Sequence, residues 1–456
     1  MANTTGIVQA AASTELWSAP YADHSIAATV NIPGSKSLSN RYLILAALGQ
    51  RPTVIHGLLR SRDTELMMQA LQALGVRCVP DDADPTTVRV TPPCNGRFSG
   101  NTAINCGLAG TVMRFVPALA LLADGPVRFD GDEQAYARPM LPLLEGLEQL
   151  GAVIAYHGQP GHLPFTVTRG AGPDDVLRPH RLETVRIDSS ASSQFISGLL
   201  LLASRLPTGL QLIHIGRSLP SMPHIEMTMH DIALSGGEVT MSKAGQWTVP
   251  HRDLQLPQDI LVEPDLSNAV PFLGAAMIAG GTVSVPHWPE HTTQPGGLVP
   301  RILMDMGADV VLDAGELKVS GDQALHGLGE YDLSAAGEIA PSIAALAVLA
   351  DAPSTLCGIG HLRGHETNRL AALVEQIRNL GADAEELPDA LVIRPVARDQ
   401  LHGRVMQTYA DHRMATFAAM IGLAVRGITV VDIATTRKTL PDFPGMWQAM
   451  LGTDAA

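Results

Sequence analysis

PGSKSLSNR, residues 33–41, forms a turn that leads from a strand into a helix. The preceding run ATVNIP (28–33) is rich in Val and Ile, which favours a strand. The following run LSNRYLILAAL (38–48) has helical propensity, and Gly49 stands where a helix C-cap is expected. Ser35 is a suitable N-cap residue. The sequence therefore predicts a strand, a tight turn and a capped helix.

Two cations and a hydroxyl group fall in the first turn of this predicted helix. Lys36, Ser37 and Arg41 lie where free backbone N–H groups and the helix dipole favour an anion. The turn is not a nucleotide P-loop, because Ser35 and Val30 stand where that motif requires Gly. The alternative interpretation is a capped surface helix with exposed cations.

Length and composition limit the possible functions. A chain of 456 residues predicts two or three domains. The net charge of −14 argues against nonspecific binding to nucleic acid or to an anionic membrane. Cys78, Cys94, Cys106 and Cys357 form neither CxxC nor a zinc spacing, which is typical of a reduced compartment. No basic and apolar leader is recognisable, and runs such as FISGLLLLA are too short to span a bilayer. We therefore expect a soluble, cytoplasmic protein.

A long-period repeat organises the rest of the chain. Short helices rich in small residues are predicted at spacings of 70 to 82 residues, starting near Ser37, Gly110, Ser192, Ser267, Pro341 and Asp411. A β-rich run follows each one, and a longer amphipathic helix follows five of them. Six similar units predict two domains of three. The first domain would span residues 34–258, and the second would combine residues 1–33 with 259–456.

Most residues with useful chemistry stand at two places in this unit. Those at the starts of the short helices are Lys36, Ser37, Arg41, Gly110, Ser192, Ser193, Gln194, Glu338 and Arg413. Those just after the β-rich runs are Arg138, Ser221, His365, Glu366, Arg369 and Lys438. If the helix N-termini share one cleft, that cleft is strongly cationic and suits substrates with phosphates and carboxylates. The alternative is that each charge is a solvated surface residue.

No metal site is predicted. His224 and His230 are six residues apart on a predicted helix, which is not a ligand spacing, and the HExxH motif is absent.

Seven motifs in order along the chain carry a family resemblance. They are PGSKSLSNR (33–41), AGTVMR (109–114), ARP (137–139), SSQF (192–195), HETNRL (365–370), DHRMA (411–415) and KTLPDFP (438–444). This set resembles the 5-enolpyruvylshikimate-3-phosphate (EPSP) synthases, which are enolpyruvyl transferases of the shikimate pathway. The resemblance implies an α/β fold with two domains, each of three βαβαββ units. It also implies that shikimate-3-phosphate and phosphoenolpyruvate (PEP) are the substrates, that no cofactor is needed, and that glyphosate is an inhibitor.

The resemblance also implies a role for each motif residue. Residues expected to meet shikimate-3-phosphate are Lys36, Ser37, Arg41, Ser192, Ser193, Ser221 and Glu338. Residues expected to hold PEP are Lys36, Gly110, Arg138, Gln194, Arg369, Arg413 and Lys438. Glu338 matches the base for the shikimate hydroxyl, and Glu366 matches the residue proposed to handle the proton at the PEP methylene. Lys36 is the third expected proton carrier.

Several positions depart from the family pattern. His365 stands where many members have Lys, His361 where many have Asn, and His224 where Tyr is common. Leu108 and Phe115 replace a common Asn and a common Pro beside the AGTVMR motif. These differences concern the shikimate contacts and the wall near Gly110.

Two other functions stay open at this point. The sister enolpyruvyl transferases that act on UDP-N-acetylglucosamine have Asn where Ser37 stands, and they use a loop Cys that DEQAY (132–136) lacks. A non-catalytic anion-binding scaffold could use the same repeat. We expect a monomer that binds neither nucleic acid nor membrane.

Overall fold

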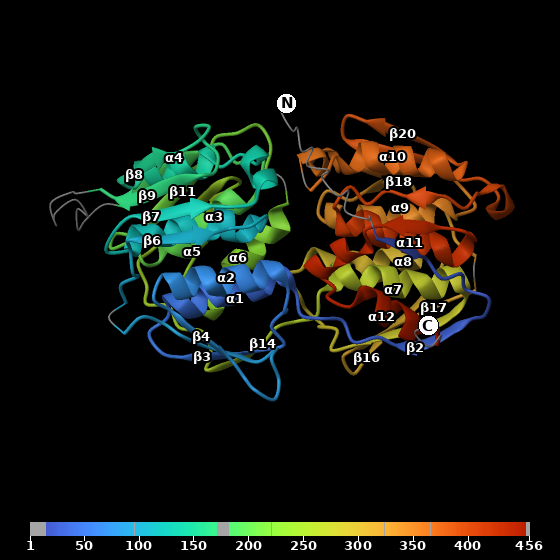
Figure 1. Cartoon of the computed structure of the whole chain (residues 1–456), viewed down its shortest axis with the longest axis horizontal. Helices are drawn as coiled ribbons and strands as arrows, with labels where there is room; N and C mark the ends of the chain where they lie inside the picture. The colour runs from blue at the N-terminus through green and yellow to red at the C-terminus, as the bar shows by residue number, and fades with distance from the viewer. Residues whose placement is uncertain are drawn as a thin grey trace, which may run out of the picture.

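The two halves of the chain form two α/β bodies side by side, as a computed structural model shows (Figure 1). The structure describes residues 15–94, 96–170, 182–219, 221–322, 324–364 and 366–452. Each helix within these ranges is too short or too polar to cross a lipid bilayer.

The strands of the described residues are short and form six sheets. They are β1 (Leu16–Ser18), β2 (Ile26–Thr29), β3 (Thr53–His56), β4 (Arg77–Pro80), β5 (Val88–Thr91), β6 (Thr102–Asn105), β7 (Val127–Asp130), β8 (Ala152–Tyr156), β9 (Phe165–Arg169), β10 (Glu183–Ile187), β11 (Leu210–His214), β12 (Thr240–Lys243), β13 (Gln246–Val249), β14 (Asp259–Leu261), β15 (Gly281–Pro286), β16 (Asp309–Asp313), β17 (Glu316–Gly321), β18 (Gly329–Asp332), β19 (Ser354–Cys357), β20 (Asp383–Leu387), β21 (Ala390–Arg394), β22 (Val405–Met406) and β23 (Thr429–Val431).

The helices alternate with these strands along the chain. They are α1 (Lys36–Leu48), α2 (Arg62–Ala73), α3 (Gly110–Leu119), α4 (Leu141–Gln149), α5 (Gln194–Ala203), α6 (Met222–Leu234), α7 (Leu266–Ala279), α8 (Val299–Asp305), α9 (Ala340–Val348), α10 (Arg369–Leu380), α11 (His412–Ala424) and α12 (Phe443–Leu451). Short 3-10 helices include η4 (Gly337–Ile339) and η7 (Ile433–Lys438).

Five of the sheets have four strands and share one topology. Their orders are β14-β3-β5-β4, β6-β7-β9-β8, β10-β11-β13-β12, β2-β15-β17-β16 and β18-β19-β21-β20. In each sheet the first pair is parallel and the next two pairs are antiparallel. A parallel pair requires a crossover connection, and hairpin-type connections suffice for the antiparallel strands. The sixth sheet has the order β1-β23-β22.

The helix predicted after PGSKSLSNR is confirmed as α1. The Ser35 hydroxyl accepts a hydrogen bond from the Leu38 backbone N–H, and Gly49 is the C-cap residue. The predicted strand before it is shorter than expected, because β2 ends at Thr29. Val30 still donates its backbone N–H to the Ser284 carbonyl, after which the chain leaves the sheet for the turn.

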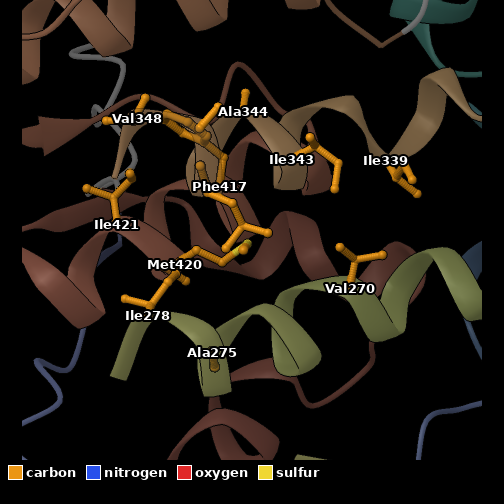
Figure 2. Close-up of a cluster of buried hydrophobic side chains, with 14 of the residues drawn as sticks. Val270, Ala275, Ile278, Ile339, Ile343, Ala344, Val348, Phe417, Met420 and Ile421 are labelled. Carbon is orange, nitrogen blue, oxygen red and sulfur yellow. The ribbon is translucent and has the colours of Figure 1, made fainter. Parts of the chain in front are cut away.

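The six predicted short helices are α1, α3, α5, α7, α9 and α11, and they form the centre of the two halves. Nearly every residue of these helices is buried, as expected for helices that are apolar on all faces. Figure 2 shows Val270 of α7, Ile343 of α9 and Phe417 of α11 within one apolar cluster. In the first half α3 and α5 approach closely: a Cβ on Gly198 would lie 2.2 Å from the Arg114 carbonyl oxygen. Only Gly permits that approach.

The described residues contain two hydrophobic clusters, which define what we call the first and second halves. The first cluster runs from Leu38 to Val262. The second combines Ile26, Val30 and Ile32 with residues from Leu266 to Leu451.

Two strands near the crossing points are exchanged between the halves. β2 pairs with β15 in the second half, although α1 follows it directly in the chain. β14 pairs with β3 in the first half, although α7 follows it. Figure 1 shows the blue β2 among the yellow and red elements. The two crossing segments meet at the antiparallel bridge between Gly34 and Pro264.

Candidate active site

A cavity of about 180 Å³ lies where the N-termini of the six central helices converge. Its lining from the first half includes Ser35, Lys36, Ser37, Asp63, Gly110, Thr111, Arg114, Arg138, Ser192, Gln194 and His224. Its lining from the second half includes Asp265, Ser267, Gln294, Glu338, Glu366, Arg369, His412, Arg413, Lys438 and Thr439. Six helix N-termini that point at one space favour an anionic occupant.

The cavity is cationic within an acidic chain. Its lining holds six Lys and Arg side chains against four Asp and Glu side chains, whereas the whole chain has a net charge of −14. Burial lowers the pKa of Lys36, and the nearby charge of Lys438 acts in the same direction. Burial also lowers the pKa of Arg114 to about 9, assisted by Arg138. Cations brought together in this way are stabilised by a multiply charged anion.

Two of these cations have unused hydrogen-bond donors. The buried Nε atoms of Arg114 and Arg413 have no hydrogen-bond partner among the described residues. One other donor of each side chain is held in place: Arg114 Nη1 donates to Gln194 Oε1 at 2.9 Å, and Arg413 Nη1 donates to the Ser267 carbonyl at 2.9 Å. Buried donors without partners on side chains that line a cavity are available to bind a ligand there.

Glu366 connects two cations on one wall. Its Oε1 lies 2.5 Å from Lys438 Nζ, and its Oε2 lies 3.0 Å from Arg369 Nη2. Arg369 is also paired with the fully buried Asp411, at 2.7 Å between Nε and Oδ2. Burial alone would lower the pKa of Arg369, but the two carboxylates outweigh it and raise that pKa. Arg369 is therefore a fixed positive charge in the cavity wall.

Glu338 is held from both halves of the chain. Ser267 Oγ donates to its Oε1 at 2.7 Å, and His224 Nε2 lies 2.9 Å from its Oε2. Burial acts to raise the pKa of Glu338, but the charges of His224 and Arg413 and the two hydrogen bonds outweigh it, so the pKa is lowered. Glu338 is thus an ionised carboxylate in the cavity wall, available to accept a proton.

Comparison with known proteins identifies the family. A model of EPSP synthase (3-phosphoshikimate 1-carboxyvinyltransferase) matches residues 21–447. The chain belongs to the EPSP synthase family. It is 63% identical over 443 residues to a 3-phosphoshikimate 1-carboxyvinyltransferase from Bifidobacterium longum, covering 96% of this chain and 98% of that one. The enzyme of the same name from Kocuria rhizophila is 48% identical over 450 residues, covering 97% and 98%.

Solved structures confirm the predicted fold class. EPSP synthase from Acinetobacter baumannii superposes with a TM-score of 0.79 at 22% identity, covering 96% of this chain and 98% of that one. The enolpyruvyl transferase NikO from Streptomyces tendae superposes with a TM-score of 0.71 at 18% identity, covering 97% and 98%. At these identities the likeness shows the shared α/β fold.

Most EPSP synthase motif residues come together in the cavity. Those in its lining are Lys36, Ser37, Gly110, Arg138, Ser192, Gln194, Glu338, Glu366, Arg369, Arg413 and Lys438. Lys36, Gly110 and Gln194 lie at or next to the starts of α1, α3 and α5, as the repeat predicted.

Three predicted residues, Arg41, Ser193 and Ser221, are not part of the cavity lining. Arg41 is buried in α1 and donates to Thr228 Oγ1 and to the carbonyls of Ser37 and His224. Ser193 is the N-cap residue of α5, and Ser221 is the N-cap residue of α6 with a left-handed φ of 55°. His365 lies outside the described residues.

Two of the residues that differ from the family pattern, Phe115 and Leu108, contact arginine side chains. Phe115 does not line the cavity but packs under Arg41, whose guanidinium carbon lies 5.4 Å from the ring centroid. The Leu108 carbonyl accepts a hydrogen bond from Arg138 Nη1 at 3.1 Å. Leu108 therefore positions Arg138 through its backbone, which any residue there could do.

Sequence reasoning missed several polar groups of the site, among them Asp265, Asp63 and Gln294. Asp265 is the N-cap residue of α7, and the repeat could have indicated it, because this helix start corresponds to those that carry Lys36 and Gly110. Asp63 and Gln294 lie outside the starts of the central helices, so the repeat could not single them out. No group of three or more His, Cys, Asp or Glu side chains in the described ranges could hold a metal ion.

Proposed function

We propose that this protein transfers the enolpyruvyl group of PEP to the 5-hydroxyl of shikimate-3-phosphate and releases phosphate. The main support is the convergence of five Lys and Arg side chains with Glu338 and Glu366 in one cavity: Lys36, Arg138, Arg369, Arg413 and Lys438. Its relatives share the name 3-phosphoshikimate 1-carboxyvinyltransferase over nearly the whole chain. Shikimate-3-phosphate and PEP each carry a phosphate and a carboxylate, and such anionic groups suit a cationic cavity.

The reaction requires two proton transfers at separate places. PEP gains a proton at its methylene carbon, which makes the central carbon cation-like, and the 5-hydroxyl loses its proton as its oxygen attacks that carbon. Glu338 is the base for the hydroxyl. Glu366 and Lys36 are the groups that deliver and later recover the methylene proton, with Lys438 hydrogen-bonded to Glu366.

Fixed cations stabilise the tetrahedral intermediate until phosphate leaves. Arg138, Arg413 and Lys438 hold the departing phosphate, and Arg369 holds the PEP carboxylate. Loss of the C–O bond to phosphate and of a proton from the new methyl group restores the double bond. Gln194 and the backbone of Gly110 complete the PEP pocket.

Contacts to shikimate-3-phosphate come mainly from the first half. Ser37 and Ser192 line the cavity and are suited to bind its phosphate and ring. Arg41, Ser193, Ser221 and His365 are the further family positions assigned to this substrate. Arg41 can act from behind the lining by holding the carbonyls of Ser37 and His224.

The domain organisation is part of the same proposal. We place the crossing between two domains at the Gly34–Pro264 bridge rather than at residue 258, because β14 pairs with the first half. Closure of the two domains over the substrates brings their cations together. We further propose a cytoplasmic monomer.

A coupled measurement of phosphate release and product formation tests the function. The purified protein is incubated with PEP and either shikimate-3-phosphate or UDP-N-acetylglucosamine, and products are followed by phosphorus NMR. We expect phosphate and enolpyruvyl product with shikimate-3-phosphate alone. Turnover with the nucleotide sugar would show the sister activity, and binding without phosphate release would show an anion-binding scaffold.

A further inference from the structure

His224 and Glu338 form a direct contact between the two halves. His224 lies in the first turn of α6, and Glu338 lies in η4 just before α9. Figure 1 shows α6 in the first half and α9 in the second. The two side chains are both about one-fifth exposed, and both line the cavity. The contact therefore exists only while the halves are close together.

The contact gives each oxygen of Glu338 its own hydrogen-bond donor. Ser267 Oγ donates to Oε1 at 2.7 Å, and His224 Nε2 lies 2.9 Å from Oε2. An ionised carboxylate only accepts hydrogen bonds, so the Nε2 atom of His224 carries the hydrogen. The backbone of His224 is also held in place, because its carbonyl accepts hydrogen bonds from Arg41 Nη2 and Thr228 Oγ1.

We propose that His224 is a positioning residue for Glu338, supplied by the opposite half of the molecule so that the base is complete only after closure. This inference rests on the proposed function, in which Glu338 takes the proton of the acceptor hydroxyl. One donor on each oxygen fixes the rotation of the carboxyl group and leaves the remaining lone pairs for the substrate. Opening removes the His224 donor and leaves a less well oriented base.

Other charged groups near the His224–Glu338 pair interact electrostatically with the Glu338 carboxylate. Arg413 favours the ionised form of Glu338, whereas Asp265 and Glu338 disfavour each other's charge. The charge of Glu338 acts to raise the pKa of Arg369 and of His361. On the other side of the pair, Arg41 Nη2 donates a hydrogen bond to the His224 carbonyl. The hydrogen bonds to the Glu338 carboxylate come from Ser267 Oγ, at 2.7 Å from Oε1, and from His224 Nε2, at 2.9 Å from Oε2. Loss of His224 should therefore change both the orientation and the pKa of Glu338.

Three substitutions of His224 separate orientation from bulk. Gln can place an N–H near the position of Nε2, Asn can place one only near Nδ1, and Leu offers none. We expect kcat to fall about tenfold or more in His224→Leu and His224→Asn, because a hydrogen bond to a charged group is lost, and to recover substantially in His224→Gln. The KM for PEP should change little in all three. His230→Gln, an exposed position on the same helix, is the matched control.

A titration of Glu338 by carbon NMR gives a readout besides activity. In protein labelled at the Glu side-chain carboxyl, with Glu338→Gln for assignment, the Glu338 titration should move to higher pH in His224→Leu. An unchanged titration, or His224→Gln no more active than His224→Asn, would overturn the positioning role. A wild-type protein without turnover would instead contradict the proposed function, and the NMR titration would still decide whether His224 acts on Glu338.

Discussion

Lys36 Nζ lies 3.6 Å from Asp63 Oδ2, both within the wall of the cavity. This ion pair is longer than the other close ones in the site, such as Arg369–Asp411 at 2.7 Å. Asp63 thus holds Lys36 in place without forming a short hydrogen bond to its ammonium group. The ammonium group remains available for an anion and for proton exchange, which its lowered pKa favours.

Replacement of Lys36 should therefore remove most of the activity. We expect Lys36→Ala to lower kcat/KM at least about a hundredfold, as loss of one preorganised charged donor does in other enzymes. Lys243→Ala, in the exposed strand β12, is the matched control and should retain full activity. A folded Lys36→Ala protein with near-wild-type turnover would remove Lys36 from the mechanism.

Arg413→Ala should cause a loss of similar size. The Arg413 side chain is buried and has an unpartnered Nε, so its removal takes a positive charge out of a dry site. We expect kcat/KM to fall at least about a hundredfold. Arg394→Ala is the control, because Arg394 is an exposed residue of β21 outside the cavity lining and pairs with Asp383 and Glu385 of β20. Equal activities of the two variants would contradict the role of Arg413.

Substrate binding should compact the molecule. The first half supplies Lys36 and Arg138 and the second supplies Arg413 and Lys438, so the cations repel one another across the cavity. Shikimate-3-phosphate reduces that repulsion and favours the closed form through its higher affinity for it. Small-angle X-ray scattering should show a smaller radius of gyration at saturation. An unchanged radius would argue against domain closure.

Gly110→Ala should reduce sensitivity to glyphosate more than affinity for PEP. A Cβ at Gly110 would lie 3.0 Å from Arg114 Nη1 and 3.0 Å from Arg138 Nη2, so both guanidiniums must shift. Overpacking of this kind costs about 1–3 kcal/mol. The inhibitor occupies the PEP position with a longer body, so its inhibition constant should rise by a larger factor than the KM for PEP. Steady-state inhibition with PEP varied measures both, and equal factors would refute the prediction.

The buried Asp231 should make stability depend on pH. Burial raises its pKa from 3.8 to about 8, and neither carboxyl oxygen has a hydrogen-bond partner among the described residues. Between these values the folded protein keeps a proton that the unfolded chain releases, so the free energy of unfolding falls as pH rises. Asp231→Asn should therefore show a smaller drop in Tm from pH 5 to pH 8 than the wild type. Asp309→Asn, at an exposed position, should behave like the wild type.

Sequence patterns predicted the central helices well because their signals are local. α1 has its N-cap serine and C-cap glycine, and α7, α9 and α11 are apolar on all faces, which is unusual for exposed helices. The same patterns placed Lys36, Gly110 and Glu338 at or next to helix starts. The sheet to which each strand belongs was harder to predict. β2 and β14 each pair with a strand of the half that does not contain the helix following them in the chain.

The family, the α/β class and the positions of the helix starts could all be predicted from the sequence, because motifs and helix caps depend on neighbouring residues. It could not show that Arg41 lies behind the cavity or that His224 meets Glu338 across the halves, 114 residues away. Those contacts follow from the packing of two separate cores against each other. Packing of this kind depends on the shapes of whole surfaces, which no local pattern encodes, so the charges that face one another become known only from the folded chain.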